Sequence, residues 1–189
     1  MLKKELRDKY KKARLAISEK DRIINSDLIL INFQKLELPF INCALTYLAA
    51  ELLGEIDTSL ILRYLEFKNP SLRIVVPRID VKSEIFRAVE IKKNDVIVKN
   101  HFGVSEPTGG TIVHPQEIDL AIVPLLAFNT RGFRVGFGKG YFDKFLSLCK
   151  PEAIKIGLSD YEAEEEIDDI NTFDIPLNFC ITPQNIYSF

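Results

Sequence analysis

Residues 120–148 read Leu-Ala-Ile-Val-Pro-Leu-Leu-Ala-Phe-Asn-Thr-Arg-Gly-Phe-Arg-Val-Gly-Phe-Gly-Lys-Gly-Tyr-Phe-Asp-Lys-Phe-Leu-Ser-Leu. The apolar run Leu120–Val123 predicts a buried strand that ends before Pro124, and the segment from about Tyr141 to Leu148 predicts a helix. A strand joined to a helix through a glycine-rich loop is typical of α/β proteins. This stretch therefore predicts the α/β fold class, and the remaining segments of the chain add further strands and helices of the same kind.

The other segments repeat this alternation of strands and helices. Further buried strands are predicted at 42–48, at 72–76 ending at Pro77, at 153–157 and at 179–182, with an antiparallel section at 85–91. Helices are predicted over 2–17, from a cap at Ser18 to about Phe33, and from Asp57 or Thr58 to about Phe67, whereas 94–110 is mostly loop. We expect an α/β protein with one three-layer domain over residues 1–189 and a largely parallel central sheet flanked by helices.

Composition limits the classes of function. With 189 residues and a net charge of −2, the chain does not match a general binder of nucleic acid or of membrane surfaces. The three cysteines are odd in number and lack metal-ligand spacing, which favours a reducing compartment. No secretory signal and no run long enough to span a bilayer is visible, so we expect a cytoplasmic protein.

The loop between the strand and the helix carries the clearest chemical signal. Gly136, Gly138 and Gly140 alternate, and Arg134 and Lys139 lie among them. Alternating glycines let several backbone N–H groups converge on an anion, and cations add to the attraction, which favours a polyphosphate ligand. The spacing matches neither a P-loop nor the dinucleotide fingerprint. A tight connection whose glycines only relieve steric clashes therefore remains an alternative.

Other charged residues are candidates for the same ligand. Lys3, Arg7 and Arg14 share one face of the first predicted helix, and Arg78 follows a predicted strand, although exposed surface positions are the simpler interpretation of all four. Asp143 and Asp174 are oxygen ligands of the kind that Mg²⁺ prefers, but a first-turn carboxylate and a turn residue are the simpler interpretations. The acidic run 162–169 is interpreted as a solvated surface segment.

Five ordered motifs resemble the 5-formyltetrahydrofolate cyclo-ligase family, also called methenyltetrahydrofolate synthetases. They are Lys3-Lys4-Glu5-Leu6-Arg7, Gly54-Glu55-Ile56-Asp57-Thr58, the stretch 102–107 ending in Glu-Pro, the segment 119–143, and Phe173-Asp174-Ile175-Pro176-Leu177 followed by Ile181-Thr182. The resemblance spans nearly the whole chain. It implies a NagB/RpiA/CoA-transferase-like fold and the ATP-dependent conversion of 5-formyltetrahydrofolate to 5,10-methenyltetrahydrofolate with release of ADP and phosphate.

The resemblance also implies roles for individual residues. Lys139 and Arg134 would be catalytic, and Asp143 and Asp174 would hold Mg²⁺. Glu55, Phe102 and Tyr141 would bind the folate, with or without a polyglutamate tail. ATP would be bound by Lys3, Lys4, Glu5, Leu6, Arg7, Arg134, Val135, Gly136, Phe137, Gly138, Lys139, Gly140, Tyr141 and Phe142. The partner would be this small molecule, with no nucleic acid and no membrane, and the protein would be a monomer.

Phe137, Phe142, Phe173 and Asn178 depart from residues that are common in the family. The resemblance therefore does not predict what these four side chains contact, although none of the four substitutions removes a proposed phosphate or metal ligand. Two alternatives stay beside the cyclo-ligase: a phosphate-ligand enzyme such as a sugar-phosphate isomerase, and a noncatalytic nucleotide- or folate-binding regulator. The isomerase would need no metal and no N-terminal cationic clamp, and the regulator would bind without turnover.

Overall fold

The computed structural model describes residues 1–50, 53–80, 85–92, 94–100 and 105–189. Its helices are α1 (Lys3–Leu15), α2 (Glu19–Phe33), α3 (Ser59–Lys68) and α4 (Tyr141–Leu146), with a 3-10 turn at Pro115–Glu117. Its strands are β1 (Cys43–Leu45), β2 (Arg73–Asp80), β3 (Ile85–Glu90), β4 (Ile97–Lys99), β5 (Ser105–Pro107), β6 (Ile112–Val113), β7 (Leu120–Val123), β8 (Ala127–Phe128), β9 (Arg134–Val135), β10 (Ile154–Leu158), β11 (Phe179–Ile181) and β12 (Ile186–Ser188).

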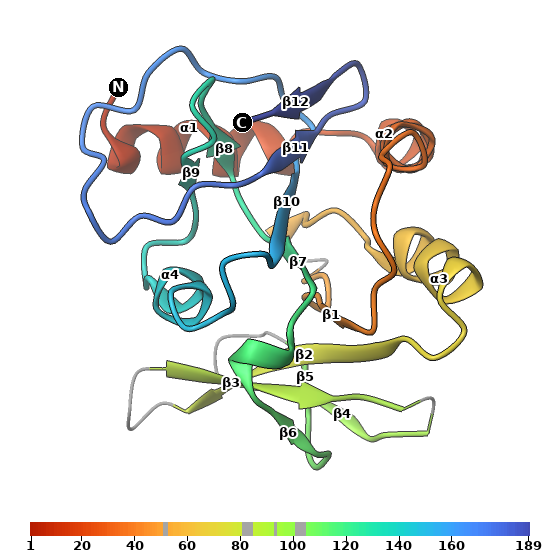
Figure 1. Cartoon of the computed structure of the whole chain (residues 1–189). Helices are drawn as coiled ribbons and strands as arrows, with labels where there is room; N and C mark the ends of the chain where they lie inside the picture. Colours follow the sequence, from red (N-terminus) through yellow and green to blue (C-terminus); the bar gives the residue numbers. More distant parts are fainter. Residues whose placement is uncertain (51–52, 81–84, 93, 101–104) are drawn as a thin grey trace.

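The centre of the molecule is a mixed eight-stranded sheet in the order β12-β11-β10-β7-β1-β2-β3-β6 (Figure 1). The five strands from β11 to β2 are parallel neighbours, and β12, β3 and β6 add antiparallel edges. This arrangement confirms the α/β class and the largely parallel sheet. The NagB/RpiA/CoA-transferase-like label stays a prediction.

Helices cover both faces of the sheet because the central strands are buried on both sides. Along β7, Leu120 and Ile122 pack into the cluster that α2 and α3 complete, whereas Ala121 and Val123 pack into the cluster that contains α4. Figure 1 shows α2 and α3 on one side and α4 on the other. The layers thus follow from the alternation of side chains along a strand.

Helix α1 packs on a small hairpin rather than on the main sheet. Leu6 and Tyr10 are buried with Leu126 and Val135 at the β8–β9 hairpin. Ser18 caps α2 by accepting a hydrogen bond from the backbone N–H of Asp21, as the sequence predicts. The first predicted helix is shorter than expected, because it ends at Leu15 instead of at residue 17.

One expectation about a strand is wrong. Pro77 does not end β2, which continues to Asp80 opposite β3. The pairing of β1 with β2 stops at Leu45 opposite Val75, so beyond that point β2 lacks a β1 partner and tolerates the missing proline N–H. The segment 94–110, expected to be mostly loop, contains the β4–β5 hairpin, whose strands have three residues each.

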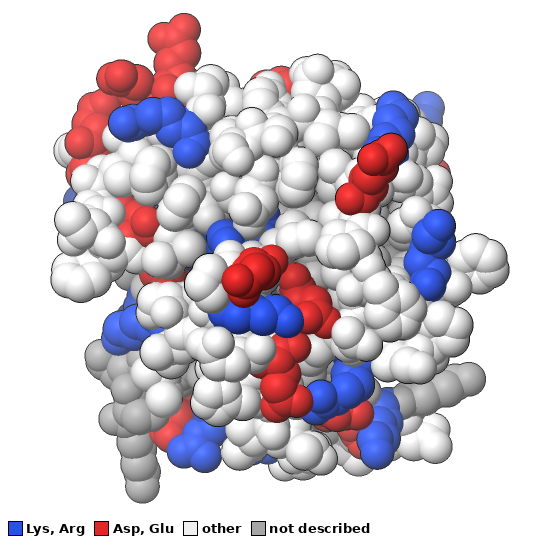
Figure 2. All heavy atoms as spheres, in the orientation of Figure 1, with Lys and Arg blue, Asp and Glu red and all other residues white. Residues whose placement is uncertain are grey.

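The charged surface is mixed. Figure 2 shows Lys and Arg interspersed with Asp and Glu on one face, with no extended patch of one sign. Within the part of the chain that the structure describes, no helix combines the length and the apolar character needed to cross a bilayer.

Candidate active site

A cavity of about 970 Å³ lies where the glycine loop, α1, α4 and the 169–175 segment meet. The ends of β1 and β2 and one residue of β3 complete its wall. This position beyond the strand ends is where α/β proteins bind ligands. Its lining comprises Lys3, Arg7, Tyr47, Leu48, Leu53, Glu55, Pro77, Ile79, Phe86, Ser105, Pro124, Arg134, Gly136, Phe137, Gly138, Lys139, Gly140, Tyr141, Phe142, Asp143, Lys144, Ser147, Asp169, Asn171, Thr172, Phe173, Asp174 and Ile175.

The glycine loop opens directly into this cavity. Gly138 and Gly140 have φ angles of +97° and +68°, which L side chains rarely adopt. A Cβ atom at Gly136 or Gly140 would meet no atom within 4 Å, so the space above the loop is open. Lys139 lies exposed between these positions. The loop therefore offers a cation and accessible backbone beside an open volume, which is what a phosphate ligand requires.

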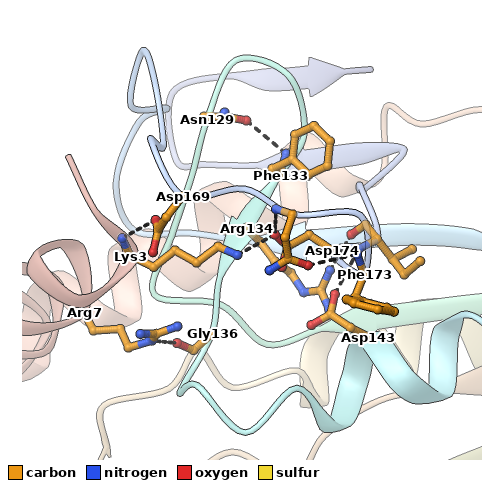
Figure 3. Close-up of polar contacts among 12 residues, drawn as sticks. Lys3, Arg7, Asn129, Phe133, Arg134, Gly136, Asp143, Asp169, Phe173 and Asp174 are labelled. Atoms are coloured by element: carbon orange, nitrogen blue, oxygen red, sulfur yellow. Dashed lines mark hydrogen bonds and ion pairs between the residues drawn. The ribbon is translucent and has the colours of Figure 1, made fainter.

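Helix α1 supplies two of the predicted cations to the same wall (Figure 3). Arg7 Nε donates a hydrogen bond of 2.9 Å to the carbonyl of Gly136, which fixes the loop to α1. Lys3 Nζ contacts the carboxylate of Asp174, and the Lys3 backbone N–H donates to Asp169 Oδ1 at 2.7 Å. Three regions far apart in sequence are thereby joined.

The other members of the N-terminal motif do not line the cavity. Lys4 is exposed, Leu6 is fully buried in the core, and Glu5 accepts a hydrogen bond from the backbone N–H of Leu2. Val135 is also buried in the core. Leu6 and Val135 therefore support the site from the core, whereas Lys4 and Glu5 face solvent. The spacing of the motif alone could not separate Lys4, Glu5 and Leu6 from Lys3 and Arg7.

The two other candidate cations point elsewhere. Arg14 is buried, with Nη2 donating to the carbonyl of Leu125, and Arg78 Nη1 lies 3.5 Å from the carbonyl of Gly109. Neither residue lines the cavity. On β2, the lining residues are Pro77 and Ile79, which flank Arg78 and face the opposite side of the strand.

Arg134 is a buried clamp. Its Nη2 donates to Asp143 Oδ1 at 2.9 Å and its Nη1 to the carbonyl of Ile175 at 2.6 Å, with the side chain 4% exposed. The backbone N–H of Ile175 donates to the same Asp143 oxygen at 3.0 Å. Burial lowers the pKa of Arg134, and the carboxylate of Asp143 opposes this effect. Arg134 therefore binds α4 to the 173–175 segment, so much of its charge is already balanced.

The two predicted metal ligands lie close together, as Figure 3 shows. Asp174 precedes Ile175, whose N–H binds Asp143, and its Oδ2 accepts from the backbone N–H of Asn171 at 2.7 Å. Among the described residues, these contacts use one oxygen of each carboxylate. No group of three or more His, Cys, Asp or Glu side chains in the described ranges is arranged to hold a metal ion. The donor set fits a cation that takes only two protein oxygens, as Mg²⁺ often does.

The far end of the cavity is apolar and contains a partly buried carboxylate. Glu55 Oε2 accepts a hydrogen bond of 2.8 Å from the backbone N–H of Ala50. Burial raises the pKa of Glu55, while the Ala50 N–H and the charge of Arg14 act in the opposite direction. Such a carboxylate suits a ligand that donates hydrogen bonds from an otherwise apolar body. The apolar lining comes from Tyr47, Leu48, Leu53, Pro77, Ile79 and Phe86.

The aromatic candidates differ in their placement. Tyr141 lines the cavity, and Phe142 lies with its ring centroid 5.0 Å from that of Phe86. Phe137 lines the cavity near Lys11, whose Nζ is 5.9 Å from the ring centroid. Phe102 lies outside the described residues.

Asn178 and Phe173 are the other two residues that differ from those common in the family. Asn178 does not line the cavity, and its Oδ1 accepts from the backbone N–H of Lys155 at 2.8 Å. Phe173 lies at the cavity with 82% of its surface exposed.

The interpretation of the acidic run as a solvated surface segment holds for Glu165, Glu166, Asp168 and Asp169, which are exposed, whereas Glu162 and Glu164 are half-buried. Asp169 supports Lys3, and Glu164 accepts hydrogen bonds from Lys9 and Tyr10 at 2.6 Å each. Glu162 accepts from Thr182, Asn185 and Tyr187. The hydrogen-bond partners of these acidic residues lie in other segments of the chain. The sequence alone therefore shows a cluster of acidic residues but not which groups they bind.

Comparisons with known proteins identify relatives of this chain. The sequence model of the 5-formyltetrahydrofolate cyclo-ligase family matches residues 1–182. A 5-formyltetrahydrofolate cyclo-ligase of Mycoplasma genitalium is 41% identical over 69 residues, which are 36% of this chain and 42% of that protein. The mitochondrial one of Arabidopsis thaliana is 30% identical over 123 residues, 59% of this chain and 44% of that protein. These alignments thus span less than half of either relative.

A longer alignment joins this chain to a probable 5-formyltetrahydrofolate cyclo-ligase of Schizosaccharomyces pombe, 27% identical over 186 residues and 88% of each chain. Among solved structures, a 5,10-methenyltetrahydrofolate synthetase of Aquifex aeolicus has a TM-score of 0.78 and 27% identity, covering 100% of this chain and 93% of its own. One from Mycoplasma pneumoniae, at 20% identity and a TM-score of 0.73 over 97% and 99% of the two chains, shares the fold. Because the family model matches almost the whole sequence, this chain belongs to the 5-formyltetrahydrofolate cyclo-ligase family.

Proposed function

We propose that this protein converts 5-formyltetrahydrofolate to 5,10-methenyltetrahydrofolate with ATP, releasing ADP and phosphate. The observation that carries the proposal is the shared cavity: the glycine loop with Lys139 and the apolar end with Glu55 open into one volume. A reaction between a polyphosphate and a flat organic substrate needs both environments side by side. Family membership supports 5-formyltetrahydrofolate and ATP as the substrates.

The chemistry explains why the site is rich in cations and glycines. The formyl oxygen on N5 is a poor leaving group, and phosphoryl transfer from ATP turns it into phosphate, a good one. Attack by N10 then closes the imidazoline ring and expels the phosphate. Both steps depend mainly on positioning and charge stabilisation, so no His or Cys nucleophile is required.

Named residues divide this work. Lys139 stabilises the charge that develops on the transferred phosphoryl group, and Arg7 fixes the loop through Gly136 while adding its charge to the same wall. Glu55 accepts hydrogen bonds from the folate ring system. Tyr141, at the junction of loop and helix, contacts the folate between the two ends. The loop is expected to tighten when the nucleotide binds.

Arg134 acts by position rather than by direct contact. Because its guanidinium already binds Asp143 and the carbonyl of Ile175, it holds the two carboxylate-bearing segments at a fixed separation. Asp143 and Asp174 would hold Mg²⁺ through carboxylate oxygens. The ion would neutralise phosphate charge there.

The proposal is tested by turnover. Wild-type protein with 5-formyltetrahydrofolate, ATP and Mg²⁺ should give the ultraviolet absorbance of the methenyl product in step with ADP release. Lys139→Ala should lower kcat by roughly 100-fold or more while the KM for folate changes little, as expected when a transition-state contact is lost. Lys12→Ala, an exposed lysine of α1 away from the cavity, is the matched control and should behave as wild type.

A protein that binds ATP but forms no methenyl product would contradict the enzymatic proposal and support a binding regulator instead. We also expect a monomer in the cytoplasm. Use of polyglutamylated folates likewise stays a prediction. Sedimentation and a comparison of mono- and polyglutamylated substrates would test the first and the last of these.

A further inference from the structure

Phe173 is an unusual aromatic residue for its position. Its side chain is 82% exposed, although it lines the cavity of the candidate active site. Among the described residues, its ring joins none of the three apolar core clusters and no aromatic pair. Figure 3 shows the ring beside Asp143 and Asp174. A large apolar ring at the mouth of a binding site, with no packing role, has its surface available for a ligand.

The backbone that carries this ring is firmly held. The N–H of Phe173 donates to Asn171 Oδ1 at 2.9 Å, and the N–H of Asn171 donates back to Asp174 Oδ2 at 2.7 Å. The N–H of Asp174 donates to the Asn171 carbonyl at 3.1 Å, and Lys3 contacts the Asp174 carboxylate. Little conformational freedom of the backbone is left to lose on binding, which favours stacking of a ligand on the ring.

The ring lies on the nucleotide side of the cavity. Helix α4 packs through Phe142 and Phe145 against Phe86 of β3, where the apolar folate end begins. The 169–175 segment lies on the other side of α4, beside the start of α1 (Figure 1). The glycine loop lies between the two ends. Because the terminal phosphate must face the folate, the base of the nucleotide extends away from it, toward Phe173.

Polar groups near the ring suit the edge of a base. Asn171 and Thr172, next to Phe173 in the chain, also line the cavity and carry an amide and a hydroxyl group. We propose that Phe173 is the stacking platform for the purine base of the nucleotide, and that it determines how strongly the enzyme binds ATP. This inference rests on the proposed function, because it assigns the base to one end of the same nucleotide site.

The test compares ligands with and without a base. Isothermal titration with MgATP, in the absence of folate, is run on wild type and on Phe173→Ala, then repeated with magnesium tripolyphosphate. The loss of one stacked ring should weaken ATP binding about tenfold. Binding of tripolyphosphate should stay within about twofold, because it contacts only the glycine loop and the cations. Phe67→Ala, which removes a ring that is 83% exposed outside the cavity, should change neither affinity.

A second variant reports the contact directly. The chain has no tryptophan, so Phe173→Trp introduces a single indole. It should bind MgATP within about threefold of wild type, and its fluorescence should be quenched by MgATP but not by magnesium tripolyphosphate. Phe67→Trp should show no quenching with either ligand.

The outcomes separate this inference from the proposed function. If wild type binds MgATP and Phe173→Ala binds it equally well, the stacking role is overturned while the nucleotide site stands. Equal weakening of ATP and tripolyphosphate would also overturn it, since the residue would then act only through the shape of the loop. Wild type that binds 5-formyltetrahydrofolate but no nucleotide would overturn both.

Discussion

The two ends of the cavity are built on opposite principles. At the end proposed to bind phosphate, charges are paired with one another: Lys3 contacts Asp174, and Arg134 binds Asp143. At the end proposed to bind folate, Glu55 lies beside apolar side chains, and its hydrogen bond within the described residues comes from the backbone N–H of Ala50. Ion pairs therefore hold the first end together, whereas at the second end burial disfavours the ionised form of Glu55.

This difference separates stability from function at the two ends. Removing a charge from the paired end leaves its partner buried and uncompensated, so it costs both folding free energy and ligand binding. Removing the charge of Glu55 relieves an unfavourable burial, so it should stabilise the protein while it weakens binding of the substrate. The three predictions below test this contrast, from the largest expected effect to the smallest.

Asp143→Asn should have the largest effect. It leaves the Arg134 guanidinium, 4% exposed, without its carboxylate, which should cost about 2 kcal/mol of unfolding free energy, or about 4–8 °C in Tm. Turnover with MgATP should fall roughly 100-fold if the carboxylate also holds the metal. Thermal unfolding and initial rates over a Mg²⁺ titration measure the two losses. Asp8→Asn, at an exposed position of α1, is the control, and a stable, fully active Asp143→Asn would break the comparison.

Glu55→Gln should separate stability from binding at the other end. Because burial raises the pKa of Glu55, its ionised form destabilises the fold as the pH rises above the unfolded value of about 4.3. The variant should therefore have a higher Tm than wild type at pH 7, and the two should converge below about pH 4. The KM for folate should rise about tenfold, as expected when a hydrogen bond to a charged group is lost.

Unfolding curves from pH 3.5 to 8 and folate kinetics at pH 7 check both parts of that prediction. Glu37→Gln, at an exposed glutamate, should leave Tm and KM unchanged. A lower Tm for Glu55→Gln at pH 7 would show that the carboxylate stabilises the fold, contrary to the comparison.

Two glycines of the same loop should respond differently to alanine. At Gly138, φ is +97° and a Cβ would lie 3.3 Å from the Arg7 guanidinium, so alanine should raise the KM for ATP about fivefold through strain and displacement of Arg7. At Gly136 the φ angle is not positive and a Cβ meets nothing within 4 Å, so alanine should stay within about twofold. Steady-state kinetics at saturating folate distinguish them. An equal change in the KM for ATP in the two variants would mean that the backbone conformation of the loop does not determine ATP binding.

The sequence predicted the elements whose signal is local. The apolar run Leu120–Val123 became β7 with the same bounds, and the helix after the glycines begins at Tyr141 as expected. The short strands of the β4–β5 and β8–β9 hairpins could not be predicted, because two or three residues carry too little periodicity. Each of these strands is stabilised by pairing with the other strand of its own hairpin.

The same limit applies to the site. Motif spacing identified Lys3, Arg7 and Lys139, which all line the cavity. It could not show that Arg14 turns to the carbonyl of Leu125. Nor could it show that Arg134 pairs with Asp143, because partner choice depends on the packing of α4 against the 173–175 segment.

The contact between Lys3 and Asp174 joins residues 171 positions apart in the sequence. Synthesis begins at the N-terminus and adds roughly 5–20 residues per second. The acidic partners of Lys3 are therefore made many seconds after α1. Until Asp169 and Asp174 have been made, the phosphate end lacks one wall and Lys3 has no carboxylate to meet. A fragment that stops short of residue 169 would lack this wall altogether. If this end of the cavity binds the nucleotide as proposed, a nucleotide site that includes Lys3 and Asp174 can form only after residue 174 has been synthesised.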